Sequence, residues 1–252
     1  MNADTSQYPE HPPLPPQSPA EPPLPETLDT RALFEALLRS PQALIRRLAE
    51  PGHGALAPFL LIAVVSMLVF GAVLGSFAMH EQLWTAPLKV TAGLLIAGLI
   101  CFPSLYIFSC LAGSQANASQ LAATLAGMLA LAGLLLLGFA PAVWIFTQAT
   151  DAYGFMGVIG LAAWLTAVAF GFRFLRIAVT ATGAGSKLPL TVWSCIFLVV
   201  TLQMTTSLRP ILGRSDRILT NEKLFFLQHW IKSAGKSLPP SPAEPAPALP
   251  QP

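Results

Sequence analysis

Hydrophobic residues form five long runs in the middle of the chain, and polar residues dominate on both sides of them. Each run reaches the roughly 20 residues that a helix needs to cross a hydrocarbon core of about 30 Å. The five predicted membrane helices are Pro58–Ala78, Leu88–Ala112, Gln120–Phe146, Phe155–Ala178 and Leu188–Leu208. The pattern predicts an all-α fold, a polytopic membrane helix bundle with five transmembrane helices between two disordered, proline-rich tails.

The flanks divide the rest of the chain. Nine of the 24 prolines precede Thr30 and seven follow Lys236, and such composition is typical of disordered, extended tails. We therefore expect a tail over residues 1–29, amphipathic juxtamembrane helices over 30–57, the membrane domain over 58–208, a basic interfacial segment over 209–236 and a second tail over 237–252. Within the basic segment, Glu222–Lys232 is apolar almost all round but too short to span a bilayer.

Two short helices are predicted before the first span. Apolar residues recur at helical spacing around Leu33 and Leu37, and Ser40-Pro41 then reads as the start of a second helix. That second helix carries Arg46 and Arg47 on its polar side. Two interpretations remain open: contact with anionic headgroups, or packing on the ends of the bundle.

Charge is scarce where the apolar runs lie. Only 10% of the residues are charged, against about 25% in soluble domains. The block 58–208 holds six of them: Glu81, Lys89, Asp151, Arg173, Arg176 and Lys187. None falls in mid-membrane, which argues against ion-coupled transport. The net charge of +2 is a small balance of opposing tail charges and gives no sign of a nucleic-acid partner.

Some residues within the spans suggest contacts between helices. Gly71 and Gly75 form a Gly-xxx-Gly pair that would let two backbones approach closely. Gln203 and Thr206 share a face of the fifth span and are expected to make interhelical polar contacts, although a path for a substrate or lipid is the alternative. Pro103 predicts a kink, with Ser104 placed to bond a freed carbonyl.

Aromatic residues are expected at two depths. Trp84, Trp144 and Trp193 lie near predicted span ends, where interfacial aromatics gather. Tyr106 and Trp164 are deeper, so we expect them to pack inside the bundle.

No residue pattern indicates catalysis, a metal or a cofactor. The three cysteines match no ligand or disulfide spacing, and His80-Glu81 is a single pair without further ligands. Arg173 and Arg176 could together bind a lipid phosphate, or simply snorkel to the interface. Arg46 and Arg47 are separate candidates for contact with lipid headgroups. We take the sequon at Asn117 as a chance match. The chain is therefore not expected to be an enzyme.

Orientation follows less directly from the charges. Six positive charges flank the membrane on the N-terminal side of a five-span model and five on the other. We expect the N-terminus in the cytoplasm of a bacterial inner membrane, because no signal peptide precedes the tail. The two similar tails instead favour both ends inside, which would require four or six spans.

The segment Leu37–Leu44, followed by a basic turn and a compact five-span bundle, resembles bacterial members of the Yip (Ypt/Rab-interacting protein) membrane family. The resemblance implies the fold and an N-inside preference. The tyrosine motifs of eukaryotic members are not evident, so no partner or functional residue is carried over. The expected function is a non-enzymatic scaffold or assembly factor; the alternative is a small permease or lipid-handling subunit. The expected partners are the lipid bilayer and proteins recruited through the tails or interfacial helices, with a second copy of the chain as a further candidate.

Overall fold

The protein is all-α over the residues that the computed structural model describes, which are 29–50, 54–76, 82–149 and 153–207. The predicted tails and the segment Glu222–Lys232 lie outside this part of the chain. Within it the helices, in chain order, are α1 (Thr30–Arg39), α2 (Pro41–Ala49), α3 (Leu56–Ser76), α4 (Gln82–Leu111), α5 (Ala118–Ala149), α6 (Tyr153–Ala181) and α7 (Leu188–Ser207).

Four of these helices are long and apolar enough to cross a membrane. They cover Leu56–Ser76, Ala86–Leu111, Ala118–Ala149 and Phe155–Ala181. These four spans confirm the multi-pass membrane helices predicted from the apolar runs. In α7 the described apolar stretch, Leu188–Met204, is shorter than any of the four, so a fifth crossing stays a prediction.

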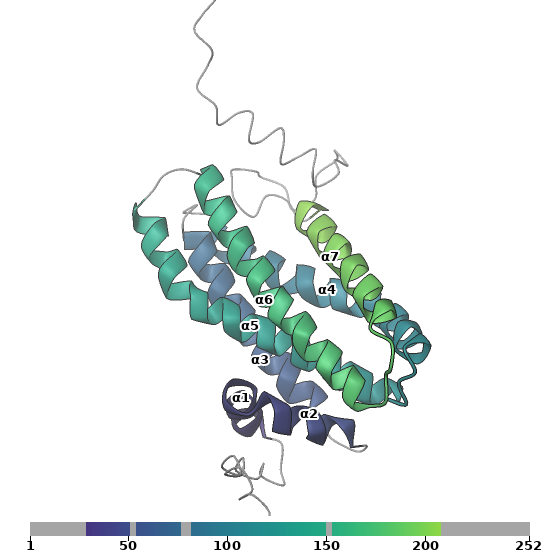
Figure 1. Cartoon of the computed structure of the whole chain (residues 1–252). Coiled ribbons are helices and arrows are strands. Elements are labelled where there is room, and N and C mark those ends of the chain that lie inside the picture. The colour runs from purple at the N-terminus through teal and green to yellow at the C-terminus, as the bar shows by residue number, and fades with distance from the viewer. Residues whose placement is uncertain (1–28, 51–53, 77–81, 150–152, 208–252) are drawn as a thin grey trace, which may run out of the picture.

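Helix α5 is the centre of the bundle. It packs most extensively against α3 and α6, while α4 packs against α3 and α7. Side chains of α5 are buried almost continuously from Leu121 to Leu136, and many of them are alanine or glycine. Small residues allow neighbouring membrane helices to approach on several sides at once, which is why this helix can be surrounded. Helices α3, α4 and α6 lie next to it, and α7 lies at the edge of the bundle (Figure 1).

Two glycines lie where α3 closely approaches its neighbours. A Cβ on Gly71 of α3 would lie 2.5 Å from the Cα of Pro87 of α4, so only glycine fits there. In α5, a Cβ on Gly133 would lie 3.2 Å from the carbonyl oxygen of Ala63. Gly75 is also buried. These contacts hold α3 tightly against both α4 and α5.

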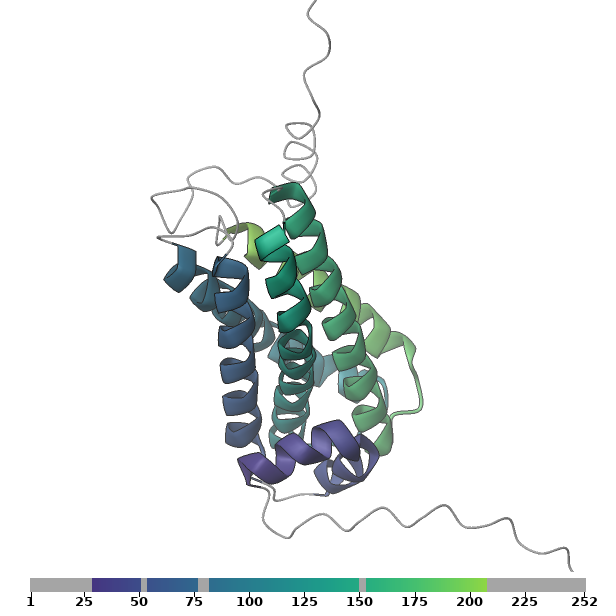
Figure 2. The same ribbon diagram turned by 90° about the vertical axis from the view of Figure 1, so that its left-hand side faces the viewer.

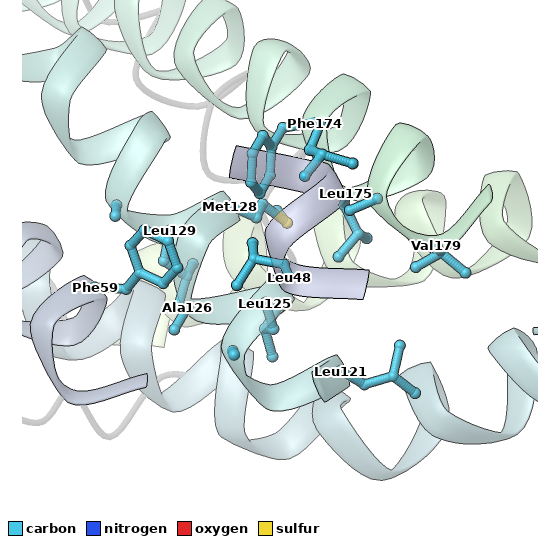
Figure 3. Close-up of a cluster of buried hydrophobic side chains, with 14 of the residues drawn as sticks. Leu48, Phe59, Leu121, Leu125, Ala126, Met128, Leu129, Phe174, Leu175 and Val179 are labelled. Atoms are coloured by element: carbon cyan, nitrogen blue, oxygen red, sulfur yellow. The ribbon is translucent and has the colours of Figure 1, made fainter. Parts of the chain in front are cut away.

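Helices α1 and α2 lie across one end of the bundle and form what we call the platform, residues 30–49 (Figure 2). Leu33 and Leu37 of α1 and Leu44 of α2 are buried. Figure 3 shows Leu48 of α2 among side chains of α5 and α6. The buried sides of α1 and α2 therefore pack on the end of the bundle, and contact of the segment with headgroups stays a prediction.

Two aromatic residues differ in burial from what their positions along the spans suggested. Trp193, near the start of α7, is fully buried in the bundle, with the ring centroids of Phe172 and Phe197 6.3 and 5.3 Å away. Tyr106 is 42% exposed on the outer side of α4 rather than packed inside. Trp144 is exposed near the end of α5, as an interfacial residue should be, and Trp164 is partly buried against the core. The side chain of Trp84 lies outside the described part.

Candidate functional site

The four arginines predicted to contact headgroups come from α2 and α6, which pack against each other. Arg46 is exposed, and Arg47 forms an ion pair with Glu50 at 2.7 Å. Arg173 and Arg176 are exposed on α6, which buries the neighbouring Leu175 and Val179 against the bundle. The fold therefore brings the four to the platform end of the bundle, and their contact with lipid phosphates stays a prediction.

The polar residues of α7 do not line a continuous path. The hydroxyls of Thr191, Ser194 and Thr201 donate to carbonyl oxygens four residues earlier, at 3.0, 2.8 and 2.8 Å, the first of them that of Lys187 just before α7. Gln203 is half-buried, and the side chain of Thr206 lies outside the described part. Hydroxyls that bond their own helix are satisfied without a partner across the bundle.

Two buried hydroxyls of α4 stand out because their oxygens have no hydrogen-bond partner. They belong to Thr91 and Ser109. The two positions are separated by about 27 Å along the helix, at 1.5 Å per residue. They therefore do not combine into one polar site.

Gln120 is a structural residue that the sequence analysis missed. Its Oε1 accepts the backbone N–H of Asn117 at 2.9 Å, while the Oδ1 of Asn117 accepts the backbone N–H of Gln120 at 2.8 Å. This reciprocal pair closes the start of α5 like a capping box. The Nε2 of Gln120 also donates to the carbonyl oxygen of Ala49 at 2.8 Å, which ties the end of α2 to α5. The spacing Asn-x-x-Gln could have revealed the cap, and it gives Asn117 a structural role.

A second missed contact joins α7 to the proline-containing part of α4. The Nε1–H of Trp193 donates to the carbonyl oxygen of Cys101 at 3.1 Å and lies 3.2 Å from the Oγ of Ser104. The Oγ of Ser104 donates to the same carbonyl at 2.8 Å. Sequence reasoning predicted that Ser104 would bond the carbonyl freed by Pro103, which is that of Leu99, whereas Ser104 bonds the carbonyl of Cys101. It gave no sign of the tryptophan.

The platform also has an outward side that the sequence analysis did not single out. Phe34 and Leu38 of α1 are 42% and 56% exposed, one helical turn apart. Charged residues surround them, and Arg39 pairs with Glu35 at 3.1 Å. An apolar pair rimmed by charge has the composition of a contact surface.

Residues for metal or redox chemistry are not brought together in the described part. No group of three or more His, Cys, Asp or Glu side chains there could hold a metal ion. Cys101 is buried, and Cys110 and Cys195 are exposed and unpaired as disulfides. His80, Glu81 and Asp151 lie outside the described residues.

The described helices identify the chain as an integral membrane helical protein with several spans. The resemblance to the Yip family rests on Leu37–Leu44 and the order of the helices, and it stays an expectation. Comparison of the chain with models of known protein families, with curated proteins and with solved structures finds no match.

Proposed function

We propose that the protein is a non-enzymatic membrane scaffold or assembly factor, and that the platform is its docking element. The observation that carries this proposal is the two-sided character of α1. Leu33 and Leu37 are buried against the bundle, whereas Phe34 and Leu38 face outward. Helix α1 is therefore fixed on one side and leaves large apolar side chains on the other.

The position of these side chains matters more than their exposure alone. Exposed apolar residues on the spans, such as Val65 of α3, are covered by lipid tails and need no partner. Phe34 and Leu38 lie on a helix across the end of the bundle, beside Arg31 and Glu35. Apolar side chains within a charged rim are typical of a surface that another protein covers.

A photoreactive residue in place of Leu38, in full-length protein in its native membrane, tests the proposal. We expect a discrete protein adduct of reproducible mass at Leu38 and lipid adducts alone at the matched control Val65. Lipid adducts alone at both positions would contradict docking of a protein on the platform.

The alternative function, a small permease or lipid-handling subunit, would use the polar part of α7 and the pair Arg173 and Arg176. The hydroxyls of α7 that bond within their own helix count against it. Solute flux or lipid scrambling in liposomes that contain only this protein, lost on Gln203→Leu, would overturn the scaffold proposal.

A further inference from the structure

The loops after α4 and α6 have the same construction 70 positions apart. Gly113 and Gly183 end their helices with φ of 92° and 100°. The N–H of Gly113 donates to the carbonyl of Cys110 at 2.9 Å, and that of Gly183 to the carbonyl of Thr180 at 3.1 Å. A left-handed residue just past a helix end is the usual role of glycine.

The two loops also bind each other reciprocally. The N–H of Gln115 donates to the carbonyl of Thr182 at 2.8 Å, and the N–H of Gly185 donates to the carbonyl of Ala112 at 2.9 Å. A shift of 70 positions exchanges these two hydrogen bonds, because Gln115 corresponds to Gly185 and Ala112 to Thr182. Such an exchange is the property of a local two-fold axis.

The correspondence continues into the helices. Helices α4 and α6 end at Leu111 and Ala181, and α5 and α7 begin at Ala118 and Leu188, so the same shift relates all four bounds. Helix α5 packs on α6, and the corresponding pair, α7 and α4, also packs together. Identical residues at this shift in α4 and α6 are Ala92 and Ala162, Leu95 and Leu165, Ala97 and Ala167, Phe102 and Phe172, Leu105 and Leu175, and Ile107 and Ile177.

Side chains 70 positions apart are also alike in burial. Leu105 and Leu175 are both fully buried, whereas Ile107 and Ile177 are both exposed. The chain therefore contains one helix–loop–helix unit twice, as α4–α5 and as α6–α7. We call each unit a hairpin, although the closely packed pairs are α5 with α6 and α4 with α7.

The two hairpins differ in what covers them. Helix α3 packs on both α4 and α5, closest at Pro87 and Gly133. The corresponding positions are Gly157 of α6 and Gln203 of α7, which define what we call the α6–α7 face. A Cβ on Gly157 would meet no atom within 4 Å. No described helix takes the place on this face that α3 takes on the first hairpin.

We propose that the α6–α7 face binds one further helix, and that this helix is the apolar segment Leu224–Ile231 of the same chain. The beginning of α6 and the end of α7 lie at the same end of the bundle, away from the platform (Figure 1). The chain that follows α7 starts there. Residues 208–223 can extend over about 50 Å, so the segment reaches the face without strain.

The composition of the segment fits this place. Apolar side chains occupy most of Leu224–Ile231, while Glu222, Lys223 and Lys232 lie beyond its two ends. As a helix the eight residues are about 12 Å long. They would fill the part of the face around Gly157, which lies about 6 Å from the start of α6. Glu222 and Lys223 would stay near the membrane surface, where their desolvation is small, and the long side chain of Lys232 would snorkel toward it.

Disulfide trapping tests the proposal in full-length protein in native membranes, with Cys101, Cys110 and Cys195 replaced by alanine. Gly157→Cys is combined in turn with a cysteine at Leu224, Phe225, Phe226 and Leu227, which together cover one helical turn. The matched control is Val158→Cys, because the neighbouring Val158 is 49% exposed. If Gly157→Cys fails to insert, Leu161→Cys, one turn further along the same side, replaces it.

We expect oxidation to give a disulfide within one chain for at least one pair with position 157, at ten times or more the yield with position 158. A disulfide between two chains through position 157 would overturn the proposal in favour of a second copy on this face. Equal or undetectable yields at 157 and 158 would overturn it in favour of lipid.

Discussion

The indole of Trp193 in α7 donates a hydrogen bond to the backbone carbonyl of Cys101 in α4 across 3.1 Å. The acceptor lies two residues before Pro103, although the carbonyl that the missing proline N–H leaves free is that of Leu99. Because Trp193 is fully buried, its N–H would have no water to bond in place of this carbonyl. The contact anchors α7, which among the described helices packs chiefly on α4.

Replacing Trp193 by phenylalanine should therefore lower the free energy of unfolding by about 1 kcal/mol through the lost hydrogen bond. The aromatic contacts with Phe172 and Phe197 are largely kept by this change. Unfolding in mixed micelles with increasing SDS measures the effect. Trp144→Phe, at an exposed position, is the control and should change little; equal losses at 144 and 193 would contradict the role of the hydrogen bond.

The two roles of Gln120, capping α5 and binding the carbonyl of Ala49, should be separable by replacing its side-chain amide with a carboxylate. Gln120→Glu keeps the oxygen that caps α5 but loses the N–H donated to Ala49, whereas Gln120→Ala loses both. A carboxylate at a helix start is itself favourable. We expect faster hydrogen exchange in α2 for both variants, and a further loss of about 1 kcal/mol in unfolding free energy for alanine alone. Unchanged exchange in α2 for Gln120→Glu would show that the Ala49 contact does not hold the platform.

Gly71→Ala should be costly, because its methyl group would lie 2.5 Å from the Cα of Pro87 and backbone atoms cannot move aside cheaply. We expect a loss of about 2–3 kcal/mol as α3 and α4 are pushed apart. Gly138→Ala is the control in α5, where a Cβ meets nothing within 4 Å, and it should be neutral or stabilising by about 0.5 kcal/mol. Equal effects in the SDS assay would contradict the close approach.

The paired loops should show coupled effects. Gly113→Ala and Gly183→Ala each force alanine into a left-handed conformation, at about 1–2 kcal/mol. Because each loop accepts a hydrogen bond from the other, the double variant should lose at least about 0.5 kcal/mol less than the sum of the single losses. Gly185→Ala has open space and serves as the control. Strict additivity would indicate that the loops do not act as one unit.

The membrane class and four spans could be predicted because a helix in lipid must be long and apolar, and those runs are visible in any sequence. The side of each helix that faces the protein core could not be predicted. Lipid tails and the protein interior both favour apolar residues, so Trp193 inside and Tyr106 outside carry no distinguishing pattern. The position of a residue along a span therefore does not tell whether its side chain is buried in the bundle, as Trp193 and Tyr106 show.

The platform illustrates a second limit. The amphipathic pattern of residues 30–49 is equally compatible with a membrane surface and with the end of a bundle, because both accept an apolar face. Only the contacts of Leu48 with α5 and α6 distinguish them. The hairpin repeat was likewise invisible, since few residues at the 70-position shift are identical and the relation depends on backbone hydrogen bonds between loops.

The most direct test of the account is the labelling of single cysteines in intact cells with a thiol reagent that does not cross membranes. Cysteines at Gln42 on the platform, at Ser186 in the loop before α7 and at Gln148 near the far end of α5 are compared in a background without native cysteines; all three positions are exposed. A membrane domain with the platform at one end requires Gln42 and Ser186 to lie on one side of the membrane and Gln148 on the other. In intact cells the reagent should therefore label either the cysteine at 148 alone or those at 42 and 186 without 148. Labelling of Gln42 and Gln148 from the same side would contradict it.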